Sequence, residues 1–211
     1  MFTFASSSAA LTAWASGTAT GLGLFAVVGA QSAFILRQGL VRAHLFSILA
    51  ICALLDGIFI FSSVWGLQAV VSWFPWLTHV ILWFGVVFLA WYALQSARRA
   101  IRTQGGLHAA QHAVPSRTGA LLAAAGFTLL NPHFWLDIMV LGSLAHSFDD
   151  ERLAFAAGAV TASVLWLLVL GAGSRLFAPY FLNPRAWRIL DGAIALIMAT
   201  LAIRLALDGL A

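Results

Sequence analysis

An amide, a proline, an imidazole and a carboxylate interrupt one of the most apolar stretches of this sequence. They are Asn131, Pro132, His133 and Asp137, and the run around them, Ala120 to Leu144, is long enough to cross a bilayer. Proline lacks an N–H group and its ring clashes with the carbonyl four residues earlier, so a helix kinks or breaks there. Hydrocarbon cannot satisfy the freed backbone groups, so the break must be buried in protein or line a wet cavity. A break beside an intramembrane charge is typical of a transport site.

The alternative for this stretch is an ordinary proline kink. A second polar interruption, Gly29-Ala30-Gln31-Ser32, lies in the first apolar run and favours function. A broken helix offers an N-terminus to a carboxylate and loose carbonyls to a cation, and an amino acid displays both groups. The residues that we predict to bind substrate are Gly29, Gln31, Ser32, Asn131, Pro132, His133 and Asp137.

Asp56 lies near the middle of another apolar run, with no basic residue within one helical turn. It is either a structural carboxyl, protonated or bonded to a neighbouring helix, or a proton carrier, and we predict the second role, proton coupling. His133 and Asp137 share a helical face, which is a weak metal-ligand spacing. Two ligands do not make a metal site, so we predict no metal site and no cofactor. Asp137 is better explained as part of a pocket for a cation.

The composition is that of an integral membrane protein. The chain has 211 residues, of which 62% are hydrophobic and only 9% charged, whereas a soluble domain has about a quarter charged. The segments between the apolar runs are too short to fold alone, so residues 1–211 form a single domain. The net charge of +4 does not indicate a nucleic-acid partner, because the arginines cluster between apolar runs, where they set topology in a lipid bilayer.

Six apolar segments are each long enough to span the hydrocarbon core at 1.5 Å per residue. They lie at about 11–36, 44–68, 77–97, 119–145, 153–174 and 186–207. Strands of a β-barrel would be shorter and would alternate, so the prediction is an all-α protein with six transmembrane helices. Two halves of three spans run in opposite senses, which predicts an inverted repeat with helices 1 and 4 interrupted.

The arginines follow the first, third and fifth segments and predict the orientation. They are Arg37, Arg42, Arg98, Arg99, Arg102, Arg117, Arg175, Arg185 and Arg188. The positive-inside rule places these loops, including a loop at about 98–118, in the cytoplasm and both termini outside. His108 and His112 in that loop have the spacing of a helical metal pair, but the glycines nearby favour a solvated linker.

Small residues in the first and fifth segments predict close helix packing. They are Gly17 and Gly21 on one side and Gly158, Ala159, Ala162 and Ser163 on the other. Ser143 and His146 are the residue types of a hydrolase, but no nucleophile elbow and no oriented acid accompany them. We therefore predict no enzyme, while a structural membrane subunit remains an alternative. Asp191 lies three residues after Arg188, which suggests a local ion pair.

Several of these stretches together resemble the LysE/ArgO family of basic amino acid exporters, and they cover nearly the whole chain in the same spacing. They are Gly29 to Phe34 continuing into Arg37-Gln38-Gly39, Asp56, Asn131-Pro132-His133 with Leu136-Asp137, Phe155 to Gly158 with Ala162-Ser163 and Trp166, and Ala186-Trp187-Arg188 with Ala199 to Ala206. One departure is that the family has Gly-Pro-Gln-Asn where this chain has Gly29-Ala30-Gln31-Ser32. Alanine does not break a helix as proline does, so the first interruption is expected to be less unwound.

The resemblance implies a multi-pass protein of the bacterial cytoplasmic membrane that exports L-lysine, L-arginine or related amino acids against a proton gradient. The substrate carboxylate would bind at the half-helix ends near Gln31 and Asn131. Asp56 and Asp137 would hold the substrate cation or carry a proton. The alternative is a divalent-metal exporter that uses His133, Asp137 and Asp56, and a homo-oligomer is left open.

Overall fold

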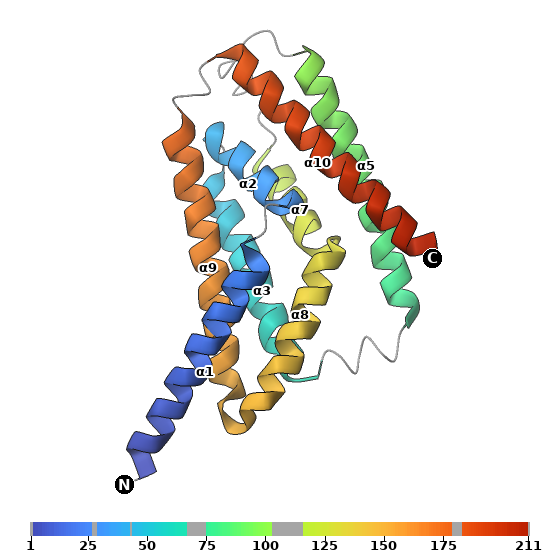
Figure 1. Ribbon diagram of the computed structural model, residues 1–211. Coiled ribbons are helices and arrows are strands. Elements are labelled where there is room, and N and C mark those ends of the chain that lie inside the picture. Colours follow the sequence, from blue (N-terminus) through green and yellow to red (C-terminus); the bar gives the residue numbers. More distant parts are fainter. Residues whose placement is uncertain are drawn as a thin grey trace.

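Helices account for nearly all of the described chain. The computed structural model describes residues 2–26, 29–42, 44–66, 75–102, 116–178 and 183–210. Its helices, shown in Figure 1, are α1 (Phe2–Phe25), α2 (Ala30–Leu40), α3 (Leu45–Val64), α5 (Pro75–Arg102), α7 (Arg117–Leu129), α8 (Pro132–Ala145), η1 (His146–Glu151), α9 (Arg152–Phe177) and α10 (Pro184–Leu210). No strand occurs among these residues, so the predicted all-α class is confirmed. The candidate metal pair His108 and His112 lies outside the described residues.

Among the described residues, length and composition identify three helical stretches that could cross a membrane. They are Leu45–Val64, His133–Phe177 and Pro184–Leu207, and a fourth results if α1 and α2 form one bent span. The longest stretch contains α8, η1 and α9, which form a hairpin in Figure 1. Each of the six predicted apolar segments therefore coincides with a helix or a pair of helices. By length and composition, however, the described helices give three or four membrane crossings and not six.

Both predicted interruptions are present. α1 and α2 meet at an angle of 82°. α7 ends at Leu129 and α8 begins at Pro132, the first helical position, where a missing N–H costs no intrahelical hydrogen bond. Gly29 and Asn131 precede the second half-helix of each pair as its N-cap residue. The two breaks thus share one local design, in which an extended cap residue precedes the second half-helix, although only α8 has a proline at its first position.

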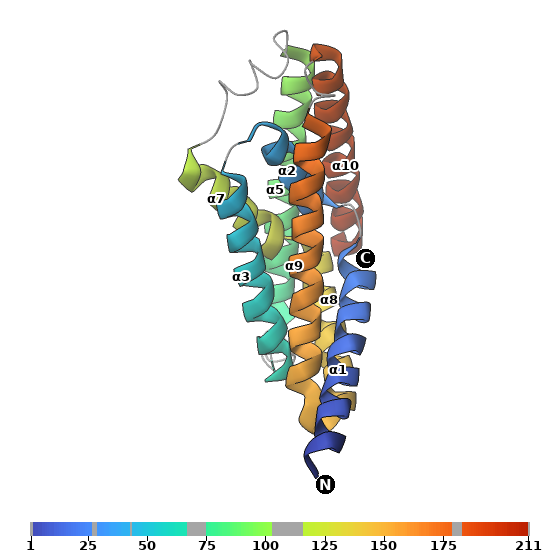
Figure 2. The ribbon, with the colours of Figure 1, turned by 90° about the vertical axis from the view of Figure 1, so that its left-hand side faces the viewer.

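Small residues set the distance between α1 and α9. A Cβ atom at Gly17 would collide with the backbone carbonyl of Phe155, and one at Gly158 would collide with the carbonyl of Trp14. A Cβ atom at Gly21 would lie 2.8 Å from the Ala162 Cβ and 3.2 Å from the Ala159 Cα. The predicted close packing of these two segments is confirmed, and it places α9 beside the first break. The second long pair is formed by α5 and α10, which lie side by side in Figures 1 and 2.

An aromatic cluster packs α2 against α5 and α7. The ring of Phe127 lies 4.9 Å from that of Phe34 and 4.7 Å from that of Tyr92, measured between centroids. All three side chains are buried. Offset and edge-on aromatic pairs of this kind contribute about 0.5–1.5 kcal/mol each beyond burial of their area. The short helix α2 is therefore held on two sides within the bundle.

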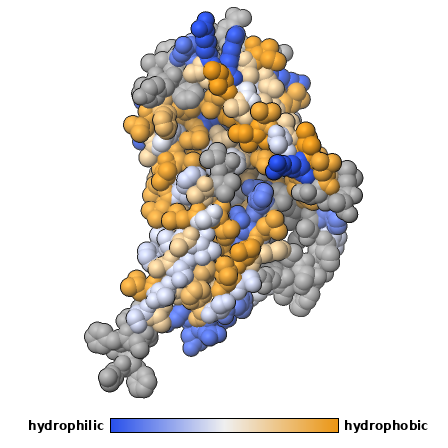
Figure 3. All heavy atoms as spheres, in the orientation of Figure 1, coloured by the Kyte–Doolittle hydropathy of each residue, from blue (hydrophilic) through white to orange (hydrophobic). Residues whose placement is uncertain are grey.

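The charged residues divide between two ends of the molecule. The end of α2, the end of α5 and the start of α10 lie together at the upper end in Figure 1, and they carry most of the arginines. We call this the basic end. The acidic run Asp149 to Glu151 belongs to η1 at the opposite end. Figure 3 shows hydrophobic residues over much of the surface between, with the largest hydrophilic group at the basic end.

The packing of α1 on α9 yields a prediction with a control in the same helix. Gly158→Ala should lower the stability of the protein by about 1–3 kcal/mol, because the added methyl group meets backbone and not a flexible side chain. Gly173→Ala should be neutral or stabilising by up to about 1 kcal/mol, since nothing lies within 4 Å of its Cβ position. Size-exclusion chromatography after heating the detergent-solubilised proteins would measure both. Equal melting curves for the two variants would contradict close packing at Gly158.

The first break yields a second prediction. Ala30→Pro should fold, because Ala30 is the first residue of α2 and proline is favoured at that position. Ala33→Pro should fail, because the Ala33 N–H donates to the Gly29 carbonyl at 3.0 Å and that hydrogen bond would be lost. The amount of each variant in purified membranes measures the outcome. Equal loss of both proteins would show that α2 does not begin at Ala30.

Candidate functional site

A cavity of about 310 Å³ lies between the two breaks, at the small end of the range for ligand sites. It is formed by the end of α1, the start of α2, the middle of α3 and α9, the start of α8, and one residue of α10. The residues that line it are Gly23, Leu24, Phe25, Gly29, Ala30, Gln31, Ser32, Asp56, Asn131, His133, Phe134, Asp137, Ser163, Trp166, Leu167, Leu170 and Leu201.

The structure brings the predicted site residues together. Those that line the cavity are Gly29, Gln31, Ser32, Asp56, Asn131, His133 and Asp137. For Pro132 the structure describes only the backbone, which starts α8 beside the cavity. Residues from positions 29 to 137 thus meet in one space, although their spacing along the sequence gives no sign of it.

The N-terminus of α2, the second half of the first interrupted helix, lies at the cavity. Gly29 caps α2 without a side chain, so no side-chain oxygen of its own occupies the first N–H groups of that helix. Gln31 Nε2 donates to Thr128 Oγ1 at 3.2 Å, which links α2 to the last turn of α7. Thr128 Oγ1 donates in turn to the Ala124 carbonyl at 3.2 Å. The orientation of Gln31 is therefore set by the other broken helix.

The second break is satisfied by side chains around it. Asn131 Oδ1 accepts a hydrogen bond from the His133 N–H at 3.1 Å, so Asn131 caps α8. Trp135 Nε1 donates to the Leu129 carbonyl at 2.7 Å and satisfies an acceptor freed by the end of α7. Without such partners a helix break in an apolar environment would be strongly unfavourable. The Phe134 N–H donates to the Asn131 carbonyl at 3.1 Å, so the start of α8 favours an anion in the cavity through its helix dipole and not through free N–H groups.

The two carboxylates of the cavity have different surroundings. Asp56 on α3 is buried, and its Oδ2 accepts a hydrogen bond from Ser163 Oγ on α9 at 2.5 Å. Asp137 on α8 is half-buried and lies one turn from the exposed His133. Within the described part of the chain, no hydrogen bond to the Asp137 carboxylate occurs. One carboxylate is thus fixed by a neighbouring helix, and the other is available to a ligand.

Some cavity residues were not predicted as site residues. Ser163 was assigned to helix packing, because its small neighbours gave no indication that it bonds to a carboxylate 107 positions away. Trp166 lies one turn further along α9 and supplies the large aromatic wall of the cavity. Thr128 does not line the cavity but accepts a hydrogen bond from Gln31, which does, and its hydroxyl three residues before Asn131 is a signal that could have identified it.

The described residues assemble neither a hydrolase site nor a metal site. His146 Nδ1 lies 2.6 Å from the Gly142 carbonyl and is bonded to backbone. Ser143 is exposed and does not line the cavity. No group of three or more His, Cys, Asp or Glu side chains with metal-binding geometry occurs among the residues described above.

Comparison with known proteins identifies the family. Residues 22–209 match the LysE type translocator family. A Mycobacterium tuberculosis protein named as a putative amino-acid transporter is 41% identical over 183 residues, which are 83% of this chain and 88% of that protein. The arginine exporter protein ArgO is 33% identical over 197 residues in Escherichia coli K12, covering 92% of this chain and 93% of ArgO. The Serratia proteamaculans protein of the same name is 35% identical over 184 residues, covering 86% and 90%. No solved structure matches the chain.

The family match begins one residue before the cavity residue Gly23 and ends in α10, so it contains every residue that lines the cavity. This chain therefore belongs to the LysE type translocator family, and it is a multi-pass membrane transport protein and not an enzyme.

Proposed function

We propose that this protein exports basic amino acids, with L-arginine and L-lysine as its main substrates, and that the proton gradient drives the export. The observation that carries the proposal is the cavity, where two half-helix N-termini and two carboxylates meet. A zwitterion with a cationic side chain has one carboxylate and two cationic groups, and these are complementary to that set. Full-length relatives named arginine exporters support the same substrate class.

The substrate carboxylate would bind between the starts of α2 and α8. Each helix N-terminus carries roughly half a positive elementary charge, so it favours an anion. Gln31 and Asn131 stand at these two starts, and Ser32 adds a hydroxyl on the first turn of α2. The Gln31–Thr128 hydrogen bond would hold the two interrupted helices at a fixed relative position around the ligand.

The side-chain cation would bind Asp137. A guanidinium or an ammonium that leaves water needs an anionic partner, or its desolvation is not offset. Asp137 has no hydrogen bond of its own within the described residues and lies on the helix that starts at the break. His133 on the same face lies between Asp137 and Asn131, so the carboxylate and cation ends of a substrate could span one turn of α8.

Asp56 would carry the coupling proton. It is buried on α3, away from the half-helix ends, and Ser163 Oγ can stabilise its ionised form by donating a hydrogen bond. A carboxyl that alternates between proton-bound and ionised states as access changes can couple substrate movement to proton movement. Its position on a different helix from Asp137 allows the two roles to be separated by mutation.

The proposed architecture is six spans in two inverted halves within residues 1–211, with the basic end in the bacterial cytoplasm and both termini outside. The repeat of the cap-and-break design at Gly29–Ala30 and Asn131–Pro132 supports it. So does the pairing of α5 with α10, the last helices of the two halves. The arginines at the basic end support the orientation through the positive-inside rule.

The orientation is tested with fused reporters. A reporter active only in the periplasm should be active after Ala211 and inactive when inserted between Gly105 and Gly106. A cytoplasm-active reporter at the same two sites should give the opposite pattern and serves as the control for expression. A periplasmic signal from the Gly105–Gly106 insertion would reverse the proposed topology.

The two carboxylates are tested by efflux of labelled arginine from loaded vesicles. Asp137→Asn should raise the apparent KM for arginine at least tenfold, which corresponds to about 1.4 kcal/mol of lost binding, because it removes the anionic partner at nearly constant volume. Asp56→Asn should abolish accumulation driven by an imposed proton gradient while leaving exchange of arginine for arginine.

Asp150→Asn is the matched control, because Asp150 is an exposed carboxylate at the opposite end from the arginines. It should behave like the parent protein in both assays. Parental efflux from both cavity variants, at normal expression, would mean that the carboxylates are structural. A rise in metal efflux without any arginine efflux would support the metal-exporter alternative instead.

A further inference from the structure

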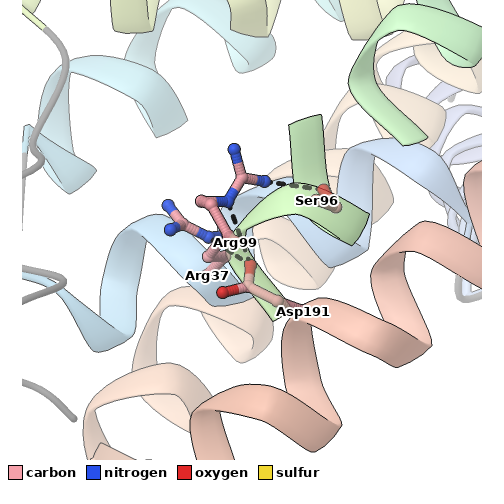
Figure 4. Close-up of polar contacts among 4 residues, drawn as sticks. All are labelled: Arg37, Ser96, Arg99 and Asp191. Carbon is pink, nitrogen blue, oxygen red and sulfur yellow. Dashed lines mark hydrogen bonds and ion pairs between the residues drawn. The ribbon is translucent and has the colours of Figure 1, made fainter. Parts of the chain in front are cut away.

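Asp191 on α10 is the acceptor of a buried ion cluster at the basic end, outside the cavity. Arg37 Nε on α2 lies 2.9 Å from Asp191 Oδ1, and Arg99 Nε on α5 lies 3.2 Å from the same oxygen (Figure 4). The sequence suggests only the nearby Arg188 as a partner. The two ion pairs instead come from positions 154 and 92 residues away, so one carboxylate joins three helices.

The two arginines of this cluster are held in different ways. Arg99 Nη2 donates to Ser96 Oγ at 2.6 Å, and its guanidinium lies 5.3 Å from the ring of Tyr92. Both of these contacts are within α5 itself. The guanidinium of Arg37 lies 5.9 Å from the ring of Trp187, which belongs to α10. Arg99 is therefore fastened to its own helix, whereas Arg37 fastens α2 to another one.

Because the ion cluster is buried, the number of charged partners that each side chain keeps is important. Arg37 is 5% exposed and Asp191 is 1% exposed. Removing the only partner of a buried charge is strongly destabilising. Arg37 and Arg99 are both ion-pair partners of Asp191, so Arg37 can leave while the carboxylate stays paired with Arg99. The departing guanidinium would then need water, which is available at the end of the molecule where α2 terminates.

The helix that Arg37 joins to α10 is the one that carries the cavity residues Gln31 and Ser32. α2 has eleven residues, with Gln31 and Ser32 in its first turn and Arg37 in its second half. A helix of this length moves as one unit, so a shift at Arg37 displaces Gln31 and Ser32. The 82° break separates α2 from α1, so the two helices do not form one rigid rod.

We propose that the Arg37–Asp191 pair positions α2 and keeps the cavity closed toward the basic end, and that its release opens the cavity there while Arg99 retains Asp191. The inference rests on the proposed function, because it assumes that access to the cavity alternates. The side chain of Gln38 on α2 supports the inference. It is 1% exposed and its Oε1 has no hydrogen-bond donor among the described residues, so movement of α2 toward water would satisfy a buried acceptor.

The test measures how fast a thiol in the cavity reacts with a membrane-impermeant methanethiosulfonate reagent. Cys52 is the single cysteine, so Leu170→Cys in a Cys52→Ser background places one thiol on the cavity wall. Right-side-out and inside-out vesicles, without any amino acid, report access from the two ends separately. Arg37→Gln should raise the labelling rate from one side about tenfold. Arg99→Gln should lower the rate from that same side severalfold, because release of Arg37 would then leave Asp191 unpaired.

Opposite effects of the two arginine variants on the labelling rate would identify the Arg37–Asp191 pair as a positioning contact. If the cluster only stabilised the helix bundle, both variants would change the labelling rate in the same direction. Arg175→Gln is the matched control, since it removes an exposed arginine near the same end, and it should label like the parent. If Arg37→Gln does not accumulate in the membrane, the direction of the Arg99→Gln effect decides alone.

Labelling changes in one common direction, or no change in either arginine variant, would overturn the inference. Because the assay contains no substrate, its result is separate from the proposed function. Opposite labelling effects together with no efflux of arginine or lysine would leave the positioning role intact and reject the substrate class. Normal efflux of arginine and lysine together with parental labelling of every variant would support the substrate class and reject the positioning role of the Arg37–Asp191 pair.

Discussion

Two interrupted helices that face each other are the constraint on which the rest of this structure depends. Each break frees backbone N–H and C=O groups in an apolar environment, where an unpaired group costs several kcal/mol. The second break meets this cost with the Asn131 cap and the Trp135 indole on the Leu129 carbonyl. The starts of α2 and α8, which are the positive ends of their helix dipoles, both lie at the cavity. The cavity is thus the place where the two interruptions direct their dipoles at a ligand.

The close contact of α1 with α9 serves the same constraint from outside the cavity. Gly17 and Gly158 allow the two helices to approach so closely that the first break lies beside α9. That approach is what brings Ser163 and Trp166 to the cavity wall, and Ser163 to Asp56 on α3. A stripe of small residues therefore determines the surroundings of a carboxylate that lies on neither of the two helices. Packing and site chemistry are not separable in this part of the molecule.

The sequence predicted the features that a single helix determines. Pro132 fixes a helix start, and the polar residues around positions 29–32 and 131–137 identify the two breaks, because both signals lie within a few residues of their effect. It did not predict Ser163 as the partner of Asp56, or Arg37 and Arg99 as partners of Asp191. Those contacts depend on which helices meet and at what height, and hydrophobic periodicity contains neither. Length and composition likewise support three or four crossings where the pattern of segments predicted six.

The short helix α2 connects the cavity with the basic end, and this has a thermodynamic consequence. If release of Arg37 from Asp191 changes access to the cavity, a ligand that prefers the released arrangement must by linkage weaken the Arg37–Asp191 pair to the same extent. A ligand that binds both arrangements equally shifts neither. Gln31 and Ser32 belong to α2 and move with it, whereas Asn131 and Asp137 belong to α8. A substrate that bridges the two helices therefore has different contacts in the two arrangements, which is the condition for binding to drive the change in access.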